Sequence, residues 1–262
     1  VVHADPGPDE GGERASEPSG EPHALERLRD LLLALLGHLE RPAQGLRVLE
    51  EAKAPSVLTP FEEPVREREL YSLYVLSAYH GGVRNVYSSD GPVETPSDLS
   101  GQKIRVIGSD TNVRMMGLMG GVGSPMAQGE VYTAIQSGVL DGAENNELIY
   151  STLSHDEIAP YYSRTEHLMM PDYLVTSPTV WDGISEEDRA IFEELLTASV
   201  DTELELFGAA VEEATAAAEE AGAEFTEVDT EVFREATRPL HEELVTSEVA
   251  QTVYDAIEAA RS

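Results

Sequence analysis

The stretch that decides the fold opens with Gln102-Lys-Ile-Arg-Val-Ile107 and closes with Glu130-Val-Tyr-Thr-Ala-Ile-Gln-Ser-Gly-Val-Leu-Asp-Gly-Ala-Glu-Asn-Asn146. In the first part, Ile104 and Val106 alternate with Lys103 and Arg105, which predicts a short strand with one apolar and one basic face. The second part predicts a helix over residues 130–137, which Gly138 ends, and then a turn at Asp141-Gly142. A strand followed by helices within 45 residues is typical of an α/β sheet.

The same alternation extends in both directions along the chain. We expect two strands on the N-terminal side, Leu73–Ala78 and Val83–Tyr87, with the glycine pair Gly81-Gly82 turning the chain between them. Ser185 with Asp188 forms a capping box for a long helix over 186–221. The remaining predicted elements are a helix at 111–119 that ends in a glycine-rich turn at 117–123, a strand at 173–176, and terminal helices at 230–244 and 247–260. The predicted fold class is therefore α/β with a helical C-terminal part.

The first seventy residues have a different character. We expect residues 1–23 to be a disordered leader, because they are rich in proline, glycine and acids and carry almost nothing to bury. Residues 24–70 begin with leucines spaced by three and four, which is typical of an amphipathic helix. No apolar run approaches the roughly 20 residues of a membrane span, and we expect no clear signal peptide.

Composition excludes several classes of protein. The 262 residues carry 17 basic against 50 acidic side chains, giving a formal net charge of −33. Such a surface repels nucleic acid and anionic lipid, so we expect neither nucleic-acid binding nor direct membrane insertion. With only two lysines, the composition indicates a high-salt habitat, in which the self-repulsion is screened. Cysteine is absent, which removes thiol catalysis and disulfides.

Signals for an enzyme are weak, since the seven histidines are dispersed and no nucleophile, metal or cofactor motif stands out. We therefore expect no catalytic residue, no cofactor and no metal. Two arginines are unusual in so acidic a chain, Arg84 beside the glycine pair and Arg105 on the predicted strand. A guanidinium can grip the carboxylate of a small organic acid with two parallel hydrogen bonds, or pair with one of the protein's own acids. Spacing alone favours the internal salt bridge.

The segments 96–106 and 125–145 together resemble the solute-binding proteins of TRAP transporters, of the DctP type. The resemblance covers about Leu73 to the C-terminus, so that residues 71–262 form the family-like region. It implies two α/β lobes joined by crossing strands and a long C-terminal hinge helix, with the ligand in the cleft between them. Residues 24–70 do not match the family, which implies that the first lobe is incomplete.

The resemblance also implies a role for individual residues. Arg105 would grip the ligand carboxylate, Arg84 would support the same anion, and Asn145 would hydrogen-bond the bound acid. Gln128 stands where the family commonly has an aromatic residue, and the resemblance places both Gln128 and Asn146 among the ligand-binding residues. The doublet Asn145-Asn146 resembles members that bind sugar acids such as hexuronates, with C4-dicarboxylates the next ligand class.

The implied function is capture of a small organic acid by an arginine clamp and hinge closure, outside the cytoplasm, for delivery to TRAP transporter membrane subunits. Two alternatives remain open. The unfamiliar first seventy residues allow a truncated or frame-shifted remnant that binds nothing. An enzyme of sugar-acid metabolism is the other, and turnover of a sugar acid would reveal it.

Overall fold

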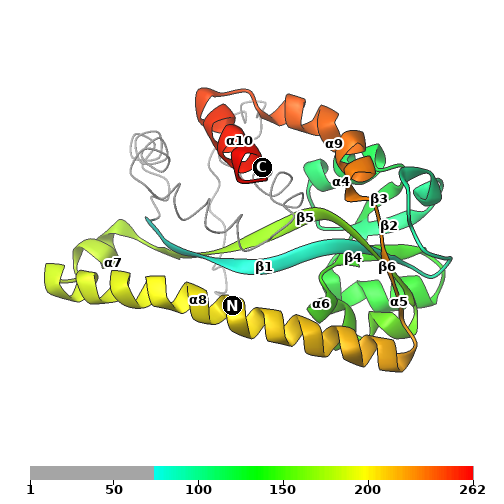
Figure 1. The fold of residues 1–262 in the computed structure, drawn as a ribbon, viewed down its shortest axis with the longest axis horizontal. Coiled ribbons are helices and arrows are strands. Elements are labelled where there is room, and N and C mark those ends of the chain that lie inside the picture. Colours follow the sequence, from blue (N-terminus) through cyan, green and yellow to red (C-terminus); the bar gives the residue numbers. More distant parts are fainter. Residues whose placement is uncertain (1–73, 262) are drawn as a thin grey trace, which may run out of the picture.

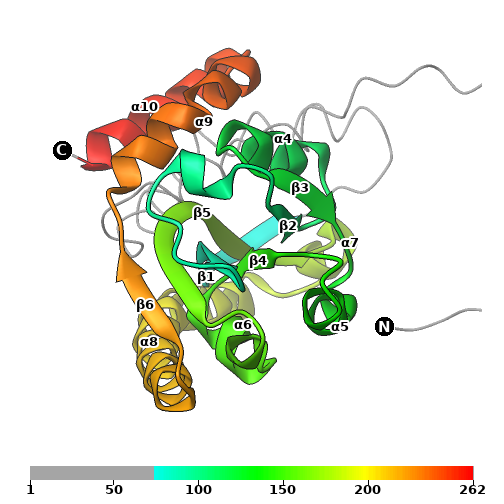
Figure 2. The ribbon, with the colours of Figure 1, turned by 90° about the vertical axis from the view of Figure 1, so that its right-hand side faces the viewer.

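The computed structural model describes residues 74–261, which form a mixed six-stranded sheet with helices on both of its faces (Figures 1 and 2). The order of strands across the sheet is β3-β2-β4-β1-β5-β6. Their bounds are β1 Tyr74–Ser88, β2 Lys103–Val106, β3 Val122–Pro125, β4 Gly142–Asn145, β5 Tyr161–Thr176 and β6 Glu224–Glu227.

The helices are unequal in length, and one dominates the molecule. Helix α8 is 36 residues long and runs beneath β1 and β5 (Figure 1). The bounds are α4 Asp110–Leu118, α5 Val131–Gln136, α6 Glu147–Thr152, α7 Pro178–Asp182, α8 Glu186–Ala221, α9 Thr230–Leu244 and α10 Glu248–Arg261. Three short 3-10 helices cover Pro96–Leu99, Gln128–Glu130 and His155–Glu157.

Each face of the sheet has its own apolar cluster. On one face, Ile104, Val106 and Leu168 pack with methionines of α4 and with Phe233 of α9. On the other face, Tyr87, Ala143 and Tyr162 pack with residues of α5 and α6 and with the end of α8. Because β4 and the C-terminal part of β1 lie between these clusters, β4 and residues Arg84–Ser88 of β1 are buried at every position, and β2 is exposed only at Lys103.

The topology creates one point at which the chain changes direction across the sheet. Strand β2 is parallel to β3 on one side and to β4 on the other. The chain leaves β2 towards β3 and then crosses back over β2 to reach β4. In sheets of this kind, ligands bind outside the carboxyl ends of the strands at such a switch point. Here those ends are Val106, Pro125 and Asn145.

The α/β fold and the long helix predicted from the sequence are confirmed. The prediction for α8 matches both bounds, since the Ser185 hydroxyl accepts a hydrogen bond from the Asp188 amide at 3.1 Å and Gly222 ends the helix at φ 105°. The prediction for α9 is also exact. Local capping chemistry fixed these ends.

The predicted chain reversal at Gly81-Gly82 is wrong. Strand β1 continues through the pair, which forms a bulge where the register with β5 shifts between His80 and Val83. Gly82 has φ 93°, which a bulge accommodates as readily as a turn does. The predicted strand at 173–176 is only the end of β5, which begins at Tyr161.

Three short strands were also missed, namely β3, β4 and β6. The segment Gly117–Gly123, expected to be only a helix exit and turn, contains the start of β3 at Val122. The predicted turn at Asp141-Gly142 leads directly into β4. A Cβ at Gly142 would lie 2.2 Å from the Tyr87 carbonyl oxygen, so this glycine allows two strands to approach closely.

The predictions for the leader at 1–23 and the helical segment at 24–70 lie outside the described residues. The two-lobe arrangement depends on those segments and stays a prediction. Among the helices of residues 74–261, none combines the length and the apolar character that crossing a membrane would need.

Candidate functional site

Three side chains named from the sequence meet at the switch point. Arg105 comes from β2, Gln128 lies three residues after β3, and Asn145 ends β4. They form one hydrogen-bonded group, in which Gln128 Oε1 accepts from Arg105 Nη1 at 2.9 Å and from Asn145 Nδ2 at 3.3 Å. The structure thus brings together residues that lie up to 40 positions apart in the sequence.

Arg105 is held without a carboxylate partner in the described part of the chain. Its Nε donates to the carbonyl oxygen of Met126 at 2.9 Å, and its Nη1 contacts Gln128. These bonds fix the guanidinium, which is only 5% exposed, and leave Nη2 without a partner among residues 74–261. Gln128 Nε2 is likewise buried and has no hydrogen-bond partner there. Two donors of adjacent side chains are thus available to an anionic or hydroxylic ligand.

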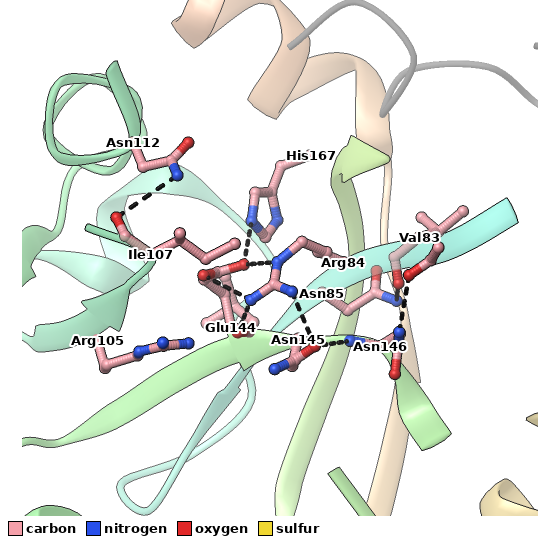
Figure 3. Close-up of polar contacts among 12 residues, drawn as sticks. Val83, Arg84, Asn85, Arg105, Ile107, Asn112, Glu144, Asn145, Asn146 and His167 are labelled. Carbon is pink, nitrogen blue, oxygen red and sulfur yellow. Dashed lines mark hydrogen bonds and ion pairs between the residues drawn. The ribbon is translucent and has the colours of Figure 1, made fainter. Parts of the chain in front are cut away.

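Arg84 is paired with one of the protein's own acids. Its Nε and Nη2 form a two-pronged ion pair with the carboxylate of Glu144, Nη2 to Oε1 being 2.9 Å, and Nη2 also donates to the Glu144 carbonyl at 2.7 Å (Figure 3). Its Nη1 donates to Asn145 Oδ1 at 2.8 Å. Both members of the pair are almost completely buried. Arg84 therefore orients Asn145 through a charge-assisted hydrogen bond.

The buried pair stays ionised. Burial alone would raise the pKa of Glu144, but the Arg84 charge, with His167 nearby, lowers that pKa to about 2. Burial likewise opposes the charge on Arg84, yet the charge and hydrogen bonds of Glu144 leave the pKa of Arg84 above its ordinary value. For Arg105, burial dominates and lowers the pKa, with the Glu144 charge opposing it. Because burial disfavours the charged form of Arg105, the carboxylate of a ligand beside it would stabilise that charged form.

The two asparagines have different surroundings. Asn145 lies between Arg84 and Gln128, and its carbonyl oxygen accepts from the Tyr162 hydroxyl at 2.9 Å. Asn146 caps α6, since its Oδ1 accepts from the Ile149 amide at 2.9 Å, while its Nδ2 donates to the Gly81 carbonyl at 3.1 Å. The side chain of Asn145 thus joins the hydrogen-bonded group of Arg105 and Gln128 at the switch point, whereas the side chain of Asn146 bonds to the backbone at Ile149 and Gly81.

Two functional side chains escaped the sequence analysis. Glu144 stood within the decisive stretch but received no role, because its neighbours in Asp141-Gly-Ala-Glu-Asn-Asn146 are mostly polar and give no local sign that it is buried. His167 was grouped with dispersed surface or satisfied histidines. It is fully buried, with Nδ1 2.8 Å from Thr165 Oγ1 and Nε2 3.7 Å from Glu144 Oε2.

Hollows in the described part of the chain lie elsewhere. One of about 360 Å³ is bordered by Tyr74, Trp181 and Arg189, and another of about 560 Å³ by Tyr79 and Phe207. Both lie along α8, and neither reaches Arg105. We place the site at the strand ends of the switch point, because the buried Gln128 Nε2 and the guanidinium of Arg105 supply convergent donors there. Within residues 74–261, no cluster of acids and histidines is arranged to hold a metal ion.

Comparisons of the sequence identify its relatives. Over residues 53–248 the chain matches the family DctP, described as bacterial extracellular solute-binding protein, family 7. A solute-binding protein of Chromohalobacter salexigens is 39% identical over 175 residues, which are 66% of this chain and 52% of that protein. The chain spans about half the length of the curated relatives it matches.

The solved structures that resemble this chain are also solute-binding proteins. A TRAP periplasmic solute-binding protein from Chromohalobacter salexigens with bound D-glucuronate superposes with a TM-score of 0.77 at 32% identity, covering 90% of this chain and 76% of that one. One from Anaerococcus prevotii with bound α/β-D-glucuronate has a TM-score of 0.70 at 38% identity, covering 81% and 69%. A third, from Sulfitobacter with bound β-D-galacturonate, has a TM-score of 0.73 at 31% identity, covering 91% and 76%.

The fold and these relatives define the class as that of the TRAP periplasmic solute-binding proteins, which bind ligands and are not enzymes. The chain belongs to the DctP family of this class over residues 53–248, so the expectation that residues 24–70 do not match the family is wrong for residues 53–70. The family match gives no support to the alternative of an enzyme of sugar-acid metabolism.

Proposed function

We propose that this chain is the solute-binding component of a TRAP transporter and that it captures a hexuronate by its carboxylate. Arg105 supplies the charged anchor through Nη2, and Gln128 Nε2 binds a second oxygen of the ligand. Asn145, oriented by Arg84, contributes a further hydrogen bond. The observation that carries the proposal is the buried guanidinium of Arg105, which has no acidic partner in the described part of the chain.

Charge counting favours an acid with one carboxylate. Because Glu144 neutralises Arg84, the described polar group offers one uncompensated positive charge, that of Arg105. A second ligand carboxylate would have to be desolvated with no cation of its own, which is costly. Several structural neighbours hold glucuronate or galacturonate, which are monocarboxylates.

A C4-dicarboxylate is the second candidate ligand. The C4-dicarboxylate-binding periplasmic protein DctP of Rhodobacter capsulatus is 29% identical over 172 residues. The hydroxyl groups of a sugar acid suit the amide groups of Gln128 and Asn145 better than a bare dicarboxylate does. In either case the loaded protein would deliver its ligand to the membrane subunits of the transporter.

Titration calorimetry at high salt against D-glucuronate, D-galacturonate and succinate tests the proposal. We expect a hexuronate to bind and Arg105→Gln to weaken that binding about a hundredfold, because a charge-assisted hydrogen bond contributes up to about 3 kcal/mol. The control is Arg114→Gln, which removes an exposed arginine whose Nη2 pairs with Glu243 at 2.7 Å. Binding by Arg105→Gln as tight as by the wild type refutes the role of Arg105, and no response to any acid favours the non-binding remnant.

A further inference from the structure

Strand β1 changes its partners along its length. Among the described residues, Tyr74–His80 pair with β5 alone, whereas Val86–Ser88 pair with β5 on one side and with β4 on the other. The segments 74–81 and 170–176 therefore form a two-stranded arm that extends away from the six-stranded part of the sheet (Figure 1). A ladder of only two strands is weak by itself, so the direction of the arm depends on its neighbours. These are helix α8, where Ser199 Oγ lies 2.8 Å from the Tyr79 hydroxyl and Glu203 Oε2 accepts from the His80 amide at 3.1 Å, and the contacts made at the base of the arm.

The base of the arm is the bulge at Gly81-Gly82. The pairing with β5 shifts register there, and Gly82 lies in the left-handed region at φ 93°. A Cβ at Gly82 would lie 2.3 Å from Asn146 Nδ2 and 2.8 Å from Asn146 Cβ. The side chain of Asn146 thus packs directly against the backbone of the bulge, in space that only glycine leaves open.

Asn146 also joins this bulge to the polar group at the end of β4. Its Nδ2 donates to the Gly81 carbonyl at 3.1 Å, and its backbone amide donates to Asn145 Oδ1 at 3.0 Å. The same Oδ1 accepts from Arg84 Nη1 at 2.8 Å, so Asn145 and Asn146 lie side by side in one network (Figure 3). A continuous path of hydrogen bonds therefore runs from the switch point to the base of the arm.

We propose that Asn146 is a positioning residue, which holds the two-stranded arm at a fixed angle to the edge of the sheet that carries Arg105 and Asn145. This inference rests on the proposed function, because that edge is the ligand site described there. Asn146 acts through the Gly81 carbonyl and does not contact the ligand. An arm already fixed in place loses less conformational freedom when a ligand orders the site, and affinity rises accordingly.

Variants of the whole 262-residue chain separate this role from simple capping of α6. Asn146→Ser keeps an N-cap hydroxyl but has no group long enough to reach the Gly81 carbonyl, whereas Asn146→Ala loses both contacts. The matched control is Asp229→Ser, which exchanges one good cap for another at the start of α9, where Asp229 Oδ1 accepts from the Glu231 amide. Two quantities are measured for each variant: hydrogen exchange of the arm amides without ligand, and the Kd for D-glucuronate.

We expect Asn146→Ser to speed exchange at residues 74–81 and 170–176 about fivefold and to weaken glucuronate binding by a similar factor, the effect of one hydrogen bond. Amides of α6 should change in Asn146→Ala but not in Asn146→Ser, and Asp229→Ser should leave the arm unchanged. Arm exchange equal to that of the wild type in Asn146→Ser overturns the inference, even if affinity falls, since a direct ligand contact would then explain the loss. If the wild type binds no hexuronate, the proposed function fails, while the exchange data still decide whether Asn146 fixes the arm.

Discussion

Removing the charge of Glu144 should destabilise the protein more than any surface substitution. Glu144→Gln keeps the shape of the side chain but leaves the Arg84 guanidinium buried without a counter-charge. Breaking a buried ion pair by removing one partner costs about 3–5 kcal/mol. The pKa gives a similar figure, because a shift from 4.5 to about 2 is equivalent to about 3 kcal/mol.

The sign of the pH dependence follows from the same shift. The pKa of Glu144 is lower in the folded protein than its ordinary value of 4.5, so its contribution is complete above that pH and is lost as the pH falls towards 2. At neutral pH we therefore expect Glu144→Gln to lower Tm by about 6–12 °C, taking about 2–4 °C for each kcal/mol. Below pH 3 the gap between variant and wild type should narrow.

Thermal and urea unfolding provide the assay, with two comparisons built into it. Adding Arg84→Met to Glu144→Gln should recover part of the lost stability, because the double variant no longer buries an unpaired charge. Glu243→Gln, which breaks the half-exposed pair with Arg114, should leave Tm nearly unchanged. A Glu144→Gln protein that melts within about 2 °C of the wild type, or a double variant whose loss equals the sum of the two single losses, would refute the reasoning.

Three further predictions concern strain, protonation and salt. Gly82→Ala should lower the free energy of unfolding by about 1–3 kcal/mol in urea titrations, because of its φ of 93° and the contact with Asn146; an unchanged midpoint would contradict this. Burial lowers the pKa of His155 to about 4, and the Arg105 charge adds to the effect. The stability that neutral His155 contributes is therefore complete above pH 6.5 and is lost as the pH falls to 4. His155→Gln should flatten the decline in the free energy of unfolding between pH 6.5 and pH 4. Raising NaCl from 50 mM to 1 M should increase Tm, because salt screens the repulsion of a chain with net charge −33, and an unchanged Tm would argue against a salt-dependent fold.

Helices α8 and α9 were predictable from local sequence signals, whereas the short helices α6 and α7 were not predicted. Ser185 and Gly222 supply the cap and the left-handed exit of α8, and both signals are visible in the sequence. The short strands β3 and β4 were not predictable in this way. Each is four residues long and carries no run of β-favouring residues; β3 pairs with β2, and β4 pairs with β1 and β2. Such pairing depends on residues far away in the chain, which a local pattern does not reveal.

The conformation at Gly81-Gly82 could not be predicted from the local sequence either. A left-handed glycine serves a turn and a bulge equally well, and only the length of the partner strand decides between them. Strand β5 extends from Tyr161 to Thr176, long enough to pair with β1 on both sides of Gly82. The sequence signal at 173–176 captured only the last quarter of β5, so the turn at Gly81-Gly82 was the simpler interpretation.

The roles of Arg84 and Arg105 could be predicted from the sequence only in part. Spacing favoured an internal salt bridge for such a residue, and this is what Arg84 forms with Glu144. The charge of the same carboxylate also acts on Arg105, yet within the described residues the hydrogen bonds of Arg105 go to the Met126 carbonyl oxygen and the Gln128 side-chain amide. Which arginine is neutralised depends on the antiparallel register of β1 and β4, in which Val86 lies opposite Glu144. A slip of one residue would turn Glu144 to the other face of the sheet and remove it from Arg84. The charge available to a ligand is thus set by strand register.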